Sequence, residues 1–97
     1  MTRRKGELTA AGIDRGWPHQ VALPAALVAR EFAAIQAFCR DLTLCLRGHS
    51  VVRDGAWWRV FCFAEAAHAE RFKQRFGGER FDPAKRGRGN AWASYRG

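Results

Sequence analysis

The chain has 97 residues, of which 47% are hydrophobic, and this length suits one small domain and excludes a second independent core. Its 17 basic and 9 acidic residues give a net charge of +8, which favours polyanionic partners such as nucleic acid. No apolar stretch approaches the roughly 20 residues that a membrane span needs, so we expect no membrane span.

The positive charge is concentrated towards the two ends of the chain. Residues 1–16 hold four basic and two acidic side chains, and residues 80–97 hold five basic and one acidic. We therefore interpret residues 1–16 as a flexible basic arm and residues 17–82 as a single α+β domain. Residues 83–97 are interpreted as a basic tail that contains Arg-Gly steps.

The three cysteines do not form a recognisable disulfide or metal pattern. Their number is odd, and none lies in a Cys-x-x-Cys pair; they are Cys39, Cys45 and Cys62. The basic N-terminus is not followed by an apolar run, so we expect no signal peptide and predict reduced thiols in a cytoplasmic protein. We expect neither a metal nor a cofactor.

The first predicted elements are a short strand and a long amphipathic helix. Pro18 places the strand of residues 17–23 at an edge or at a strand start. A helix is predicted from Pro24, because proline is tolerated in a first turn. Apolar residues then recur at steps of four and three, which is typical of one buried helical stripe. The stripe contains Val28, Phe32, Ile35, Cys39 and Leu42.

A β-hairpin is the strongest local prediction. Asp54-Gly55 separates two β-rich runs at residues 43–53 and 56–63, and both turn positions tolerate positive φ. A two-residue loop fixes the register, so Val52 should lie opposite Trp57 and the pairs should continue outwards from there.

A second helix and a last short strand complete the predicted domain. The helix runs from Glu65 to Phe76, Gly77-Gly78 ends it, and residues 79–82 can form the strand. The order strand, helix, strand, strand, helix, strand is that of the ferredoxin-like βαββαβ fold. Such a fold is a two-layer sandwich in which two helices cover one face of a four-stranded antiparallel sheet, and the other face is open.

Alternation of side chains divides the hairpin into two faces. One set holds more large apolar groups, so we place it against the helices; it contains Leu44, Leu46, Gly48, Ser50, Val52, Trp57, Arg59, Phe61 and Phe63. The other set forms the expected open face; it contains Cys45, Arg47, His49, Val51, Trp58, Val60 and Cys62. A bulge at Gly48 would change the facing of residues 43–47.

Residues 56–63, followed by a helix, resemble the signature octapeptide of the RNA recognition motif. They read Ala-Trp-Trp-Arg-Val-Phe-Cys-Phe, with Trp58 at the aromatic third position. The basic first and aromatic fifth positions of the signature are absent, and Gln20 stands where the first-strand motif has an aromatic residue. The resemblance implies the same fold over about residues 17–82 and base stacking at Trp58 and Val60.

These observations predict a small non-catalytic binding module that uses its open sheet face. Nucleic acid, either RNA or DNA, is the most concrete ligand. Trp58 and Val60 would form a stacking platform, which Arg47 and His49 would flank. The tail would add phosphate attraction through Lys85, Arg86 and Arg88.

Three alternatives remain open at this point. The open faces of two copies could pack together and form a homodimer. The chain end around Trp92 and Arg96 could instead fold back over the face. A small enzyme or a thiol or metal site is the third alternative, although no serine lies in a nucleophile elbow and no histidine has an obvious carboxylate partner by spacing.

Overall fold

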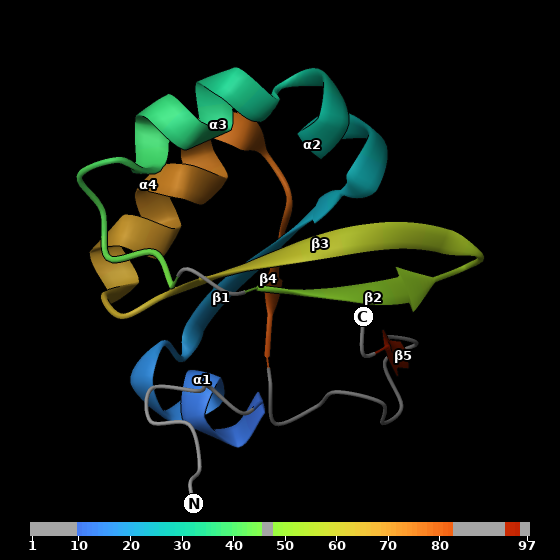
Figure 1. Cartoon of the computed structure of the whole chain (residues 1–97), viewed down its shortest axis with the longest axis horizontal. Helices are drawn as coiled ribbons and strands as arrows, with labels where there is room; N and C mark the ends of the chain where they lie inside the picture. The colour runs from blue at the N-terminus through green and yellow to red at the C-terminus, as the bar shows by residue number, and fades with distance from the viewer. Residues whose placement is uncertain (1–9, 46–47, 83–92, 96–97) are drawn as a thin grey trace, which may run out of the picture.

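The computed structural model describes residues 10–45, 48–82 and 93–95, which form an α+β fold. Its elements in chain order are α1 (Ala10–Gly16), β1 (His19–Pro24), α2 (Ala25–Arg30), α3 (Phe32–Cys39), β2 (His49–Arg53), β3 (Ala56–Phe63), α4 (Ala66–Phe76), β4 (Glu79–Phe81) and β5 (Ala93–Tyr95). The strands form one antiparallel sheet in the order β4-β1-β3-β2-β5. Helices α2, α3 and α4 cover one face of the sheet, and α1 lies on the other side (Figure 1).

The hairpin register is confirmed. Val52 pairs with Trp57, and the neighbouring pairs follow the same register. Asp54 and Gly55 have positive φ angles of 53° and 78°. Two positive φ angles in a two-residue loop are typical of a type I′ turn, whose twist matches that of the flanking strands.

Strand β2 is shorter than predicted because the chain bulges before it. Leu44 bridges Phe63, whereas His49 pairs with Val60. The chain therefore advances five residues from Leu44 to His49, whereas β3 advances only three residues from Val60 to Phe63. The excess of two residues is even, so Leu44 keeps the helix side of the sheet that the unbulged register predicts. Gly48 lies within this bulge.

The long helix predicted from Pro24 is in fact two helices. The backbone departs from helical geometry at Glu31, where φ is −106° and ψ is 21°, and α3 begins at the next residue. Ile35 and Cys39 are buried as the apolar stripe predicts. Phe32, which directly follows the break, is 58% exposed and leaves the stripe.

The main core lies between the sheet and helices α2 to α4. Phe72 of α4 is fully buried at its centre, with ring centroids of Phe61 at 5.0 Å and of Phe63 and Phe76 at 5.2 Å. Burial of one such ring contributes about 1.5–3 kcal/mol. The bounds of α4 and its glycine cap at Gly77, with φ of 87°, agree with the sequence prediction.

The prediction of an open second face is wrong at the centre of the sheet. Val51 and Cys62 are fully buried on that face, and Val60 is 2% exposed. Ile13 of α1 packs in the same cluster and is 6% exposed. Residues 10–16, which were expected to be part of an irregular arm, therefore form a helix that covers the sheet.

Gln20 ties this covering helix to β1. Its side chain is fully buried, and its Nε2 donates to Oδ1 of Asp14 and to the carbonyl of Trp17, each at 3.0 Å. Oε1 of Gln20 has no hydrogen-bond partner, which costs on the order of 1–3 kcal/mol. Gln20 is thus a structural anchor at the position where the RNA recognition motif has a stacking ring.

Candidate binding surface

Trp58, the expected stacking platform, is half-buried and already has a cation over its ring. The guanidinium carbon of Arg53 lies 4.7 Å from the Trp58 ring centroid. Nη1 and Nη2 of Arg53 also donate to the two carboxylate oxygens of Glu79, at 2.7 and 2.6 Å. Arg53 therefore joins strand β2 to strand β4 across the sheet, and one face of the Trp58 ring is occupied by the protein itself.

The other predicted site residues do not complete an open platform. Val60 is buried in the cluster beneath α1. His49 is half-buried on the same sheet face, and its ring packs edge-on against Phe81 at a centroid distance of 5.5 Å. The structure therefore brings Trp58, Val60 and His49 to one face, but in a packed cluster. Arg47, Lys85, Arg86 and Arg88 lie outside the described residues.

Two exposed aromatic side chains lie on the helix side of the sheet, one on α3 and one on β3. Phe32, at 58%, and Trp57, at 50%, are the large hydrophobic side chains that are exposed among the residues that the structure describes. Trp57 and the exposed Arg59 lie two residues apart on β3 and share a sheet face. Figure 1 shows that the hairpin extends beyond α2, so helices do not cover this end. We call Phe32, Trp57 and Arg59 the overhang surface.

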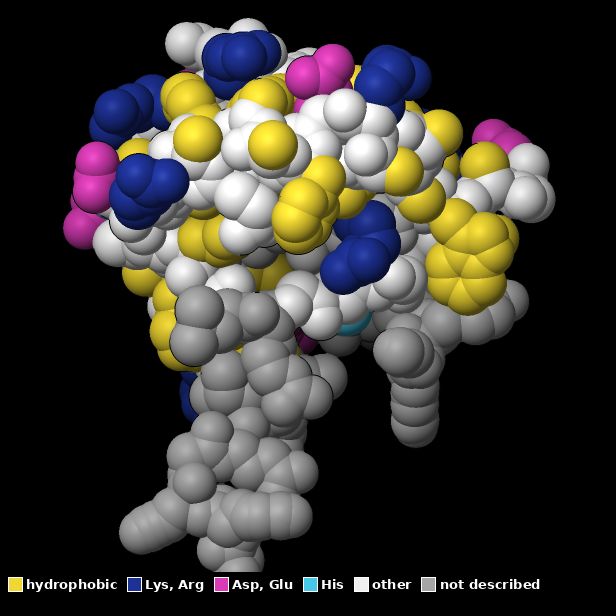
Figure 2. Space-filling model, turned by 45° about the horizontal axis from the view of Figure 1, so that its top comes forward, with side chains coloured by type: hydrophobic (Ala, Val, Ile, Leu, Met, Phe, Trp, Pro, Cys, Tyr) yellow, Lys and Arg dark blue, Asp and Glu magenta, His cyan; other side chains and the backbone are white. Residues whose placement is uncertain are grey.

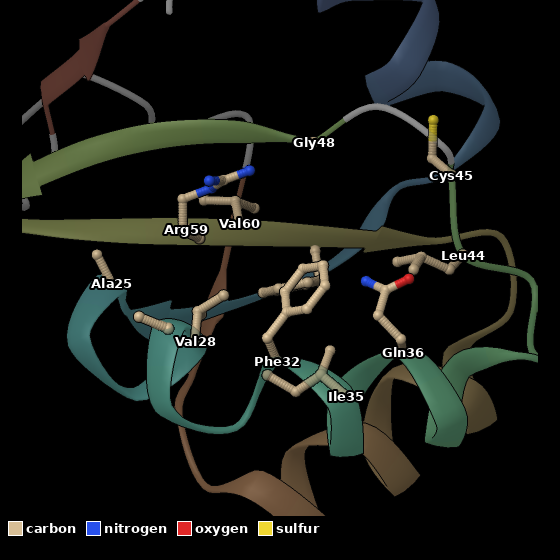
Figure 3. A pocket seen from close by; sticks show the side chains of 12 residues that line it. Ala25, Val28, Phe32, Ile35, Gln36, Leu44, Cys45, Gly48, Arg59 and Val60 are labelled. Carbon is tan, nitrogen blue, oxygen red and sulfur yellow. The ribbon is translucent and has the colours of Figure 1, made fainter.

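A pocket of about 350 Å³ lies beside the overhang surface, between helices α2 and α3 and strand β3 (Figure 3). Apolar side chains form most of its lining, among them Val28, Leu44 and Phe61. Phe32 and Arg59 of the overhang surface also line it. Its volume falls within the range of small-ligand sites, about 300–1,000 Å³. We call it the α2–β3 pocket.

The α2–β3 pocket has a positively charged side chain in its lining. In the part of the lining that the structure describes, Arg59 is the one charged side chain of the α2–β3 pocket. Among the described residues, none forms an ion pair or hydrogen bond with the guanidinium of Arg59. Figure 2 shows Lys and Arg side chains, together with some Asp and Glu, interspersed with apolar ones over the helical side of the molecule. An anion at this site would therefore find a guanidinium that has no competing carboxylate.

One histidine has a carboxylate near it, contrary to the sequence analysis. Nε2 of His68 lies 3.6 Å from Oε1 of Glu65, and Nδ1 of His68 accepts the backbone N–H of Thr43 at 3.0 Å. The Thr43 hydroxyl lies 2.9 Å from the same Nδ1 and accepts the backbone N–H of Glu65 at 3.2 Å. These contacts join Thr43, in the segment that follows α3, to Glu65 and His68 at the start of α4. The three side chains therefore hold two chain segments together.

The cysteines offer little reactive chemistry in the folded protein. Burial raises the pKa of the Cys39 thiol to about 11, which keeps it protonated near neutral pH. Cys45 and Cys62 are also buried, and neither forms a disulfide with another described cysteine. No group of three or more His, Cys, Asp or Glu side chains within the described ranges could hold a metal ion.

Comparisons with known proteins identify no family. No protein-family model, curated protein or solved structure matches the chain. Across the part of the chain that the structure describes, none of the helices has the length and apolar character needed to cross a membrane. The overhang surface and the α2–β3 pocket are therefore the features from which a function can be inferred.

Proposed function

We propose that the protein is a small, non-catalytic, cytoplasmic module that binds single-stranded nucleic acid, RNA or DNA. We also propose that its domain is a ferredoxin-like βαββαβ unit. The strand order β4-β1-β3-β2, in which β3 separates β1 from β2, supports that topology. In this interpretation α1 and β5 are additions to the βαββαβ unit. The three cysteines are buried and form no disulfide with one another, which agrees with a reducing compartment.

The overhang surface carries this proposal. Two exposed aromatic side chains, Phe32 and Trp57, accompany an exposed guanidinium, Arg59, on one side of the hairpin. Aromatic rings bind unstacked bases, and each stacked base contributes about 1–3 kcal/mol. Arg pairs with phosphate in a bidentate geometry, and the net charge of +8 adds long-range attraction to a polyanion.

The proposed surface differs from the one expected from the sequence. Trp58 is held under Arg53, and Val60 is buried, so neither is available for stacking without a rearrangement. Trp57, the neighbouring residue, points to the opposite side of the sheet and is exposed. A homodimer formed through the second sheet face is disfavoured for the same reason, because α1 covers the centre of that face.

The test is a binding titration with the full-length chain. Labelled mixed-sequence single-stranded RNA and DNA oligonucleotides are titrated at low and at physiological salt, and binding is followed by fluorescence anisotropy. Trp57→Ala should weaken binding about 5- to 150-fold, the loss that corresponds to one stacked base. Arg59→Gln should weaken it more than Arg71→Gln, which removes the same charge from an exposed position on α4.

The controls separate the surface from general charge attraction. Trp58→Phe keeps an aromatic ring beneath Arg53, so we expect wild-type affinity from this variant. Equal weakening by Arg59→Gln and Arg71→Gln, together with an unchanged Trp57→Ala, would contradict the overhang surface. Absence of binding at low salt would refute the nucleic-acid function, and light scattering on the same samples would then test the homodimer.

A further inference from the structure

The α2–β3 pocket has room for more than a solvent molecule. It opens to the surface, where the exposed Phe32, Gln36 and Arg59 line it, and its volume is about 350 Å³. Its lining is largely apolar, and the exposed ring of Phe32 stands at it. Such a site suits a flat apolar group that can pack against a ring.

Two polar side chains give the pocket its chemical selectivity. They are the amide of Gln36 on α3 and the guanidinium of Arg59 on β3. In Figure 3 they extend from opposite walls, with the Phe32 ring between them. A Gln amide offers donors and an acceptor side by side, as the edge of a base requires. A guanidinium matches a phosphate.

We propose that the α2–β3 pocket binds one unstacked nucleotide, so that the protein recognises a base and its phosphate as a unit. The base would stack on Phe32, with Gln36 at its polar edge and Arg59 at the phosphate. This inference rests on the proposed function, because the overhang surface would deliver a strand of nucleic acid to the pocket mouth. It adds a preference for a strand with an extruded or terminal base.

Other small ligands fit the pocket less completely. No Asp or Glu is among the described residues that line it, so a cationic ligand would be repelled by Arg59 without a carboxylate there to offset the repulsion. A fatty carboxylate would use the apolar walls and Arg59 but would bury surface near the Gln36 amide without pairing it. A nucleotide uses the ring, the amide and the guanidinium together.

The experiment is an NMR titration of the ¹⁵N-labelled full-length chain with free 5′-mononucleotides. The four nucleotides are compared with a nucleoside, ribose 5-phosphate and octanoate. We expect saturable shifts of the Gln36 side-chain amide with a mononucleotide, and weaker binding of the two fragments. Gln36→Ala should raise the dissociation constant about tenfold, as expected for the loss of a paired amide. Gln74→Ala is the matched control, an exposed amide on α4.

The possible results distinguish a failure of the pocket assignment from a failure of the proposed nucleic-acid function. Oligonucleotide binding without any mononucleotide shift at Gln36 would overturn the pocket and leave the overhang surface standing. Mononucleotide binding without oligonucleotide binding would support the pocket and refute the nucleic-acid function. Octanoate binding as tight as that of any nucleotide, with no effect of Gln36→Ala, would overturn the assignment in favour of an apolar acid.

Discussion

Gly48→Ala is the substitution that most directly tests the bulge that precedes β2. A Cβ at Gly48 would stand 2.5 Å from the carbonyl oxygen of Val60. That oxygen belongs to the backbone of β3, whose strand is paired on both sides, so it cannot move without disturbing the sheet. We expect Gly48→Ala to destabilise the protein and to loosen one wall of the α2–β3 pocket.

Two opposing contributions determine how much Gly48→Ala changes the free energy of unfolding. Extra atoms in a well-packed position cost about 1–3 kcal/mol. Replacing glycine by alanine restricts the unfolded chain and returns about 0.4–1 kcal/mol. The net loss in the free energy of unfolding should therefore lie between about 0 and 2.6 kcal/mol, with about 1.3 kcal/mol at the midpoints of the two ranges. For a domain of this size, each ~1 kcal/mol lowers Tm by about 4–8 °C.

The assay is urea unfolding followed by tryptophan fluorescence, with Gly16→Ala as the matched control. A Cβ at Gly16 would meet nothing within 4 Å, so only the unfolded-state contribution remains and that variant should be as stable as the wild type or slightly more so. Gly48→Ala should lower the urea midpoint at an unchanged slope. Equal midpoints for the two variants would refute the close approach of Gly48 to Val60.

Two further predictions concern titratable groups. Pairing with Arg53 holds the pKa of Glu79 below its ordinary value of 4.5, so its stabilisation is present above about pH 4.5 and is lost as the pH falls through the lowered pKa. The Glu79 side chain is 46% exposed, so Glu79→Gln should cost at most about 1 kcal/mol near pH 7 and flatten the acid limb of the stability curve. Cys39, which is 7% exposed with a pKa of about 11, should resist alkylation at about pH 8 in the folded chain and react in concentrated urea. Peptide mapping checks this, and equal labelling in both states would contradict the burial.

The local elements could be predicted because their causes are local. The hairpin register follows from a two-residue Asp54-Gly55 loop, which fixes every pair outwards from the turn. The end of α4 follows from Gly77, whose φ of 87° suits glycine. The division of the hairpin into two faces also held through the bulge, because the two extra residues there preserve the alternation of side chains.

The break in the first predicted helix has no comparable local signal. The apolar stripe continues without a gap through Glu31, and no glycine or proline lies there. Neither neighbouring helix shows a side-chain cap at that residue. Helix propensity and periodicity therefore favour one continuous helix, and packing against the sheet decides otherwise. Phe32 is exposed at the α2–β3 pocket because the helix breaks directly before it, and the sequence does not predict that break.

The sequence by itself determined four of the five described strands, the turn, the last helix and the alternation that separates Trp57 from Trp58, whereas β5 lies in the segment that was interpreted as a tail. Only the tertiary structure decided which of these two rings is exposed. The large apolar residues at this end of the chain are Ile13 in α1 and Trp17 just after it. They span little more than one helical turn, and so short a pattern does not predict a helix that covers the sheet. Burial depends on what the rest of the chain brings to each face: α1 and Arg53 cover one side of the sheet, and the helices on the other side end before the hairpin does.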